Sequence, residues 1–139
     1  MTDEATDIAR YTLERHEGLR LKPYRDTVGK LTIGYGRNLD DMGITEMEAD
    51  VLLYGDIARV RDELEAFDWF PRMTDSRRAA LINMAFNLGM PRLRGFRKMI
   101  AALEAGEYDR AAEESLDSKW ARQVGQRAQE IAQMIRGVP

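Results

Sequence analysis

Residues 16–36 of the chain read HEGLRLKPYRDTVGKLTIGYG, and this stretch decides the fold. At its start Gly18 directly follows Glu17, and glycine commonly ends a helix at that position. At its end residues 31–36 alternate between large apolar side chains and Thr or Gly, which is the period of a strand. Residues 27–30 (TVGK) have the composition of a turn. The stretch therefore predicts the end of a helix followed by a small β-hairpin.

Helices are predicted on both sides of this hairpin. An amphipathic helix is expected over about residues 3–17. After a polar connection over residues 37–43, Thr45 and Glu48 form a capping-box pattern, which predicts the start of a long helix over about 46–66. Further along the chain, the apolar period and the Gly and Pro residues predict a turn at 90–95 and helices over 74–88, 96–105, 108–116 and 120–136.

These elements predict an α+β fold that is mainly α, with one small hairpin beside four or more helices. A chain of 139 residues is long enough for one well-buried core or for two small lobes that share a long helix. We expect a single domain over residues 1–139. In it a hairpin lobe at about 18–43 is joined by a linking helix at about 45–67 to a helical lobe. The helical lobe consists of residues about 72–139 together with the N-terminal helix.

The composition argues against several kinds of site. The chain has no cysteine and a single histidine, so neither a disulfide nor a Cys or His zinc site can form. We therefore expect no metal and no cofactor. The first residues, MTDEATD, are unlike a secretory signal peptide, and no stretch approaches the roughly 20 apolar residues that span a bilayer. The sequence thus predicts a soluble protein made in a cytoplasm.

Charge is divided unevenly along the chain. Residues 1–71 carry 9 Lys and Arg against 16 Asp and Glu, whereas residues 72–139 carry 12 against 8. The second part is therefore a candidate to meet an anionic surface, either a bacterial envelope polymer or nucleic acid. Solvated helix faces explain the same mild excess of positive charge equally well.

Three side chains near the hairpin have the chemistry for cleaving a glycosidic bond: Glu17, Asp26 and Thr32. Two carboxyl groups in unlike environments can divide the work of catalysis. One donates a proton to the leaving oxygen, and the other activates the nucleophile or stabilises the charge that develops in the transition state. A helix end favours a protonated carboxyl group at Glu17, whereas a turn offers solvent and backbone N–H groups to Asp26. Thr32 is predicted to point onto a strip of strand kept open by Gly34 and Gly36.

Each of these residues also has an ordinary structural explanation. Taken alone, Glu17 would be an exposed acid, Asp26 a turn former and Thr32 a residue of high strand propensity. The same holds for Asn83 and Asn87, which lie one turn apart on an otherwise apolar helix and would form a structural hydrogen-bond network if buried. The wider sequence pattern has to decide between a functional and a purely structural role for these residues.

Further blocks extend the pattern over nearly the whole chain. In order, they are EGLRL at 17–21, Asp26, TIGYG at 32–36, RRAALINM at 77–84, FNLG at 86–89, GF at 95–96, SKW at 118–120 and RA at 127–128. This series resembles the phage-type lysozymes, glycoside hydrolase family 24, which pair a glutamate in Glu-Gly-x-Arg-Leu with an aspartate nine positions later and a threonine in Thr-Ile-Gly-x-Gly. A lone acid pair would be a weak signal, whereas these blocks in one order are a strong one.

The resemblance implies a lysozyme-like fold, with a cleft between the hairpin lobe and the helical lobe. In that family the residue matching Glu17 is the general acid, and those matching Asp26 and Thr32 position a water. That water attacks the anomeric carbon from the opposite face, which inverts its configuration. The resemblance also implies that Asn83 lies at the floor of the cleft near the sugar. Arg127 matches an arginine that pairs with the catalytic glutamate.

Three positions depart from the family pattern. Arg37 stands where the best-known relatives have a histidine, so a buried His–Asp pair cannot be carried over. The connection over residues 37–44 is shorter than in those relatives, so the hairpin lobe should be smaller and a strand could be lost. Val124 replaces a polar residue near the cleft, which changes the expected sugar contacts.

The implied activity is hydrolysis of bacterial peptidoglycan at the β-1,4 bond between N-acetylmuramic acid and N-acetylglucosamine, by a monomeric muramidase without a cofactor. We expect Tyr24, Gly36, Asn83, Asn87 and Arg127 to bind the substrate. The resemblance further implies host cell lysis, in which a separate holin-type membrane-permeabilising protein releases the enzyme from the host cytoplasm to the cell wall. Binding of nucleic acid and stable membrane insertion are not expected.

Two other functions stay open. A lytic transglycosylase needs one acid and forms an anhydro product by internal attack, and the presence of Asp26 and Thr32 argues against it. A catalytically silent wall-binding or membrane-disrupting protein would use the basic residues at 92–98 or the amphipathic helix at 120–136. A tail-associated or secreted module is an alternative setting for the enzyme.

Overall fold

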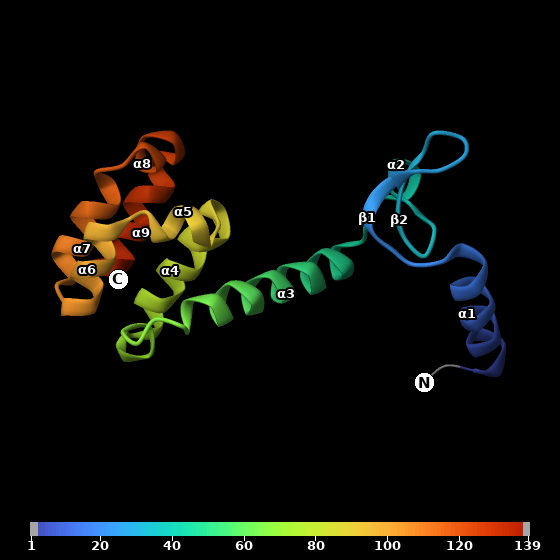
Figure 1. Ribbon diagram of the computed structural model, residues 1–139, viewed down its shortest axis with the longest axis horizontal. Coiled ribbons are helices and arrows are strands. Elements are labelled where there is room, and N and C mark those ends of the chain that lie inside the picture. The colour runs from blue at the N-terminus through green and yellow to red at the C-terminus, as the bar shows by residue number, and fades with distance from the viewer. Residues whose placement is uncertain (1–2, 138–139) are drawn as a thin grey trace. The chain divides into compact units, whose positions relative to one another are not determined.

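The structure is a computed structural model that describes residues 3–137. Contacts divide the chain into two compact units, Met1–Asp50 and Val51–Pro139, and each unit is described here by itself. The chain is mainly helical with one three-stranded antiparallel sheet (Figure 1), which confirms the predicted fold class. The predicted single domain, with the N-terminal helix in the helical lobe, concerns the relation between the units and stays a prediction.

The first unit begins with helix α1 (Glu4–Glu17), as predicted. The side chain of Asp3 accepts a hydrogen bond of 2.7 Å from the backbone N–H of Thr6, which caps the N-terminus. At the other end Gly18 has a φ of 71° and donates its N–H to a carbonyl of the last turn. These caps fix the helix so that Glu17 is its last residue.

The predicted hairpin is present, and it is part of a larger sheet. Strand β1 (Arg20–Arg25) pairs with β2 (Leu31–Gly34), and β2 also pairs with β3 (Arg37–Asn38) in the order β1-β2-β3. A short helix, α2 (Leu39–Met42), follows directly. The polar connection predicted over 37–43 therefore contains a strand, β3, and a short helix, α2.

The start of helix α3 (Glu46–Leu64) is held by the predicted capping box. Thr45 donates its N–H to Glu48 Oε1 at 2.9 Å, and Glu48 donates its N–H to Thr45 Oγ1 at 3.1 Å. The guanidinium of Arg37 donates to both carboxylate oxygens of Glu48, at 3.0 and 2.6 Å, and to the carbonyl of Gly43. These charge-assisted bonds tie β3 to the first turn of α3 and lower the pKa of Glu48 to about 2.

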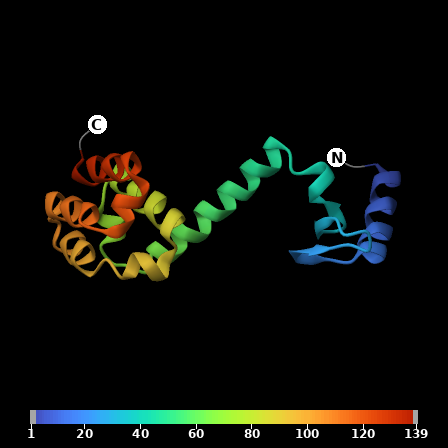
Figure 2. The ribbon, with the colours of Figure 1, turned by 90° about the horizontal axis from the view of Figure 1, so that it is seen from above.

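The second unit holds the hydrophobic core. α3 enters this core through Val60 and Leu64 in its last turns. The helices that follow are η1 (Phe70–Arg72), α4 (Asp75–Leu88), α5 (Met90–Arg94), α6 (Arg97–Ala105), α7 (Tyr108–Leu116), α8 (Lys119–Val124) and α9 (Gln126–Arg136). α9 packs against both α4 and α7, and α6 packs against α7 (Figures 1 and 2).

Two expectations for this unit are wrong. The predicted turn at 90–95 contains helix α5, because Pro91 stands in the first turn, where its missing N–H costs nothing. The predicted single helix over 120–136 is two helices, since Gly125, with a φ of 60°, ends α8 and starts α9. Glycine adopts this conformation at little steric cost, so the chain changes direction there.

Helix α4 buries one face only, although residues 79–88 are apolar nearly all round the helix. Its N-terminus is capped by the hydroxyl of Thr74, and Gly89 follows its end with a φ of 83°. Asn83 and Asn87 lie on the open face and are exposed. The two amides are therefore accessible to a ligand. The face toward the core carries Ala80, Leu81, Met84, Ala85 and Leu88.

Candidate active site

The carboxyl group of Glu17 lies against the backbone of Gly36. A Cβ atom added to Gly36 would be 2.6 Å from Glu17 Oε2 and 3.0 Å from its Cδ. The φ of Gly36 is 75°, a conformation that L side chains rarely adopt. Glycine is therefore required at position 36 for two reasons. It allows the backbone turn after β2, and it leaves room for the carboxyl group of Glu17. Within residues 3–50 no hydrogen bond or ion pair reaches that carboxyl group.

Asp26 is held in the turn between β1 and β2. Its Oδ1 accepts the backbone N–H groups of Val28 at 3.0 Å and Lys30 at 2.8 Å. Its own N–H donates to the carbonyl of Lys30 at 2.9 Å. Asp26 thus closes the turn with one carboxylate oxygen, and among residues 3–137 no hydrogen bond reaches Oδ2.

Thr32 is buried, contrary to the expected open strip. Its exposed fraction is 3%, because β2 is the central strand and Thr32 pairs with Tyr24 on one side and Asn38 on the other. Its hydroxyl donates to the carbonyl of Lys30 at 2.9 Å. The strand also ends at Gly34, two residues earlier than predicted. Asp26 and Thr32 are therefore brought together through a shared partner, Lys30.

Tyr24 of β1 is half-buried, and its ring lies under the guanidinium of Arg20. The carbon of that guanidinium is 4.5 Å from the ring centroid, within the range of a cation–π contact. The predicted residues of the first unit thus form two groups. Glu17 contacts Gly36, while Tyr24 and Thr32 face each other across β1 and β2.

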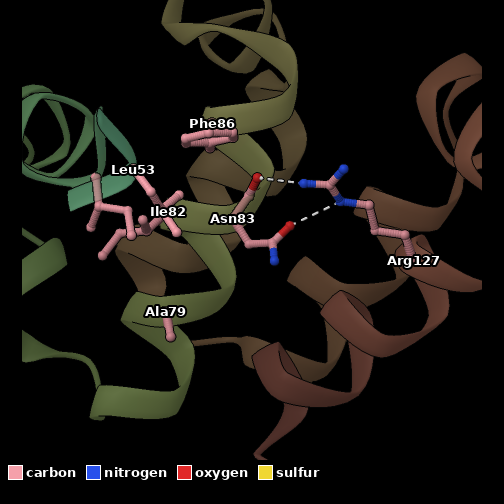
Figure 3. Close-up of a pocket in the computed structure, with 7 residues that line it drawn as sticks. Leu53, Ala79, Ile82, Asn83, Phe86 and Arg127 are labelled. Atoms are coloured by element: carbon pink, nitrogen blue, oxygen red, sulfur yellow. Dashed lines mark hydrogen bonds between the residues drawn. The ribbon is translucent and has the colours of Figure 1, made fainter. Parts of the chain in front are cut away.

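In the second unit Asn83 lies beside a cavity of about 430 Å³ (Figure 3). The Nε–H of Arg127 donates to Asn83 Oδ1 at 3.0 Å, and a terminal nitrogen of the same guanidinium reaches the Asn83 carbonyl at 3.5 Å. The cavity therefore combines one polar edge with an apolar wall. The other residues of the wall are Leu53, Ile57, Ala79, Ile82 and Phe86.

Asn87 is held in a similar way by a residue that the sequence analysis did not assign to the site. The indole N–H of Trp120 donates to Asn87 Oδ1 at 2.7 Å. Indole and guanidinium N–H groups can only donate, so the side-chain oxygen of Asn83 must face Arg127 and that of Asn87 must face Trp120. Both amide NH₂ groups remain as donors on the exposed face of α4. The signal for Trp120 was available, since a buried Trp usually finds an acceptor.

Comparison with known proteins identifies the family. The profile described as phage lysozyme matches residues 14–136. The chain belongs to the phage lysozyme family. Membership confirms the enzyme class that the sequence motifs implied, a lysozyme-type glycoside hydrolase acting on peptidoglycan. The matched range contains the end of α1, the sheet and all helices of the second unit up to Arg136.

Three relatives show how this phage lysozyme compares with longer and similar chains. It is 31% identical to the pre-baseplate central spike protein Gp5 of Enterobacteria phage T4, over 88% of this chain and 26% of the spike protein. It is 33% identical to an endolysin of Acyrthosiphon pisum secondary endosymbiont phage 1, over 79% and 75%. It is 24% identical to probable T4-type lysozyme 1 of Dictyostelium discoideum, over 97% and 95%. The chain thus spans about a quarter of the spike protein and most of the other two.

Residues 3–137 of the phage lysozyme contain neither a cluster of potential metal ligands nor a helix that could span a membrane. No group of three Asp, Glu or His side chains lies where it could share a metal ion. No helix in that range combines the length and the apolar character needed to cross a bilayer.

Proposed function

We propose that this phage lysozyme hydrolyses the β-1,4 bond between N-acetylmuramic acid and N-acetylglucosamine in peptidoglycan, with inversion at the anomeric carbon. Glu17 donates a proton to the leaving oxygen. Asp26 and Thr32 position and activate the attacking water. No cofactor takes part, because acid catalysis with water as the nucleophile needs only these groups.

The observation that carries the proposal is the unlike setting of the two carboxyl groups. Glu17 is exposed and has no hydrogen-bond partner within its unit, so its oxygens are available to a ligand. Asp26 is half-buried and accepts two backbone N–H bonds on one oxygen. One carboxyl group is thus open to a ligand, whereas the other is held in place by the backbone, and two such groups can divide the roles of glycosidic bond cleavage.

The water-positioning role falls mainly to Asp26. Its free Oδ2 can accept a proton or a hydrogen bond from water. The hydroxyl hydrogen of Thr32 is committed to the Lys30 carbonyl, so Thr32 can offer only the lone pairs of Oγ1. An inverting enzyme leaves about 6.5–9.5 Å between its two carboxyl groups for this water.

Substrate recognition is assigned to residues of both units. Tyr24 and Gly36 contribute a ring face and an approachable backbone in the first unit. In the second unit Asn83 and Asn87 offer amide donors, and Arg127 orients one of them. Amide donors suit the carbonyl oxygens of N-acetyl groups.

The biological setting is host cell lysis, in line with the endolysin relative. The enzyme would act as a monomer on the cell wall after synthesis in the host cytoplasm. A separate holin-type protein would release it. A tail-associated role is the alternative, in line with the spike protein relative.

Product analysis tests the proposed reaction. Digestion of purified peptidoglycan should yield muropeptides with hydrated N-acetylmuramic acid ends, and proton NMR should detect the α-anomer first. Anhydro ends would show internal attack and assign the enzyme to the lytic transglycosylases. The committed hydroxyl of Thr32 is the one observation that favours this second function, because it removes a water-orienting donor.

A further inference from the structure

One peptide group connects the two residues to which the water-positioning role is assigned. The carbonyl of Lys30 accepts the backbone N–H of Asp26 at 2.9 Å and the hydroxyl of Thr32 at 2.9 Å. The N–H of Lys30 also donates to Asp26 Oδ1 at 2.8 Å. Because a peptide group is planar, its carbonyl cannot turn without the N–H that follows it. The orientation of the Lys30–Leu31 peptide group therefore fixes where both donors must lie.

The other end of this peptide group is bound by a side chain from outside the hairpin. The N–H of Leu31 donates to Asp40 Oδ2 at 2.7 Å. The N–H and the carbonyl of one peptide group point in opposite directions, so Asp40 lies across the group from Asp26 and Thr32. Asp40 is thus connected to both residues through a single rigid group.

Asp40 takes a place that a longer third strand would otherwise fill. β3 ends at Asn38, which pairs with Thr32 of β2. Leu31 lies one residue beyond that pair, so the pairing of β2 with β3 does not include its N–H. The helix that follows, α2, contacts both β2 and β3 (Figure 1). It brings the Asp40 carboxylate to an N–H that needs an acceptor.

The charge of Asp40 strengthens its hold on the peptide group. A hydrogen bond to a carboxylate is about twice as strong as one between neutral groups. The bond also polarises the peptide group, which makes the Lys30 carbonyl a better acceptor for its two donors. The guanidinium of Arg25 lies 4.0 Å from the same carboxylate oxygen and donates instead to the carbonyl of Gly29 at 3.1 Å. Asp40 Oδ2 therefore takes its hydrogen bond from Leu31.

We propose that Asp40 is a positioning residue for the hydrolytic reaction. It holds the Lys30–Leu31 peptide group, and this group holds Asp26 and Thr32 in the directions from which they place the attacking water. The inference rests on the proposed function, because it concerns the residues assigned there to the water. Asp40 acts through the peptide group and not by contact with the substrate.

The neighbouring acid, Asp41, offers a matched control because it holds different groups. Its Oδ1 accepts the ammonium group of Lys30 at 3.0 Å, and its Oδ2 accepts the amide of Asn38 at 2.9 Å. Both partners are side chains, and the ion pair is exposed. Asp40 and Asp41 both lie in the first turn of α2, so their charges act alike on the helix end. They differ in that Asp40 binds the peptide group.

Steady-state kinetics on soluble peptidoglycan fragments tests the role of Asp40. Asp40→Ala should lower kcat at least about tenfold and keep KM within about twofold, because a misplaced water affects the transition state more than substrate binding. Asp40→Asn should restore most of the rate, since its amide oxygen accepts the same N–H. Asp41→Ala should keep kcat within about twofold, as expected when an exposed ion pair is lost.

A merely structural role of Asp40 predicts other results. Equal losses of kcat in Asp40→Ala and Asp41→Ala, or no recovery in Asp40→Asn, would overturn the inference. NMR of the unchanged protein tests the contact itself and depends on neither activity nor the folding of a variant. It should show a scalar coupling between the amide nitrogen of Leu31 and the carboxylate carbon of Asp40. Absence of this coupling would also overturn the inference.

A double-variant cycle keeps this test separate from the proposed function. Asp26→Asn tests the proposed function by itself, and full kcat in that variant would contradict the role of Asp26 in catalysis. Asp40→Ala added to Asp26→Asn should cause a smaller fold-loss of kcat than it causes in the unchanged protein, because its effect passes in part through Asp26. The same fold-loss in both backgrounds would show that Asp40 acts independently of Asp26 and would overturn the inference alone.

Discussion

Gly36 sets the position of the Glu17 carboxyl group, and this close approach can be tested by a single methyl group. In Gly36→Ala the new Cβ would lie 2.6 Å from Oε2, so the carboxyl group must move. We expect kcat to fall at least about tenfold with little change in KM, because misplacement of the proton donor affects the transition state. Steady-state kinetics on soluble peptidoglycan fragments measures both constants.

Gly34 provides the matched control for this substitution. Its φ of 70° is nearly the same, and a Cβ there would meet no atom within 4 Å. Gly34→Ala should therefore show the same backbone strain, about 1 kcal/mol of stability, without the loss of kcat. Equal kinetic losses in the two variants would mean that strain, and not the displaced carboxyl group, explains the effect.

At the scale of elements, the ion pair of Arg37 and Glu48 makes the start of α3 sensitive to acid. The pKa of Glu48 is lowered to about 2 from 4.5 by its bonds to Arg37 and to the N–H of Thr45. A carboxyl group whose pKa is lower in the folded state stabilises that state above its unfolded pKa. This stabilisation is complete above about pH 4.5 and is lost as the pH falls toward 2.

Amide hydrogen exchange can follow this loss at the first turn of α3. Protection there should decrease between pH 4.5 and 2 after correction for the intrinsic exchange rate. Glu48→Gln should remove the pH dependence in that window. Glu46→Gln, which changes a neighbouring acid of the same turn, should keep it, and a flat profile in the unchanged protein would exclude the capping ion pair as its source.

Arg77 connects the start of α4 with the end of α9. Its Nε donates to the carbonyl of Ile135 at 2.7 Å, and a terminal nitrogen donates to the carbonyl of Arg136 at 2.9 Å. Its guanidinium carbon also lies 3.9 Å from the ring centroid of Tyr108. Arg77→Ala should destabilise the protein by about 2 kcal/mol, because charged donors to otherwise unpaired helix-end carbonyls are lost.

The neighbouring Arg78 offers a control of the same size and charge. It pairs with Asp75, whose side chain is 97% exposed, and such surface pairs contribute about 0–1 kcal/mol. Chemical denaturation of Arg77→Ala and Arg78→Ala compares the two positions. Similar losses of stability would show that the contacts to α9 add nothing beyond a surface pair.

Helix ends were predictable from sequence because their signals are local. Asp3 and Gly18 cap α1, and Thr45 with Glu48 caps α3, within three or four residues of the groups they satisfy. The break at Gly125 was missed because glycine within a helix pattern is often tolerated. Only the packing of α9 against α4 and α7 selects the turn there.

For the whole molecule, some features of the candidate site follow from local sequence, whereas others depend on tertiary packing. Glu17, Asp26 and Thr32 are proposed from sequence motifs, and the range matched by the family profile contains all three positions. The burial of Thr32 does not follow from them, because it depends on pairing with a third strand, β3, outside the predicted hairpin. The partner of Asn87 is likewise set by tertiary packing, since Trp120 is 33 residues away.

The central claim, that Glu17 supplies the proton for bond cleavage, is tested most directly by the rate of turbidity loss of purified peptidoglycan. Glu17→Gln keeps the shape of the side chain but cannot donate an acidic proton, so we predict loss of nearly all activity, at least about 10²-fold. Glu14→Gln, one turn earlier on α1 and paired with Arg10, should keep the full rate. Full activity of Glu17→Gln would contradict the account.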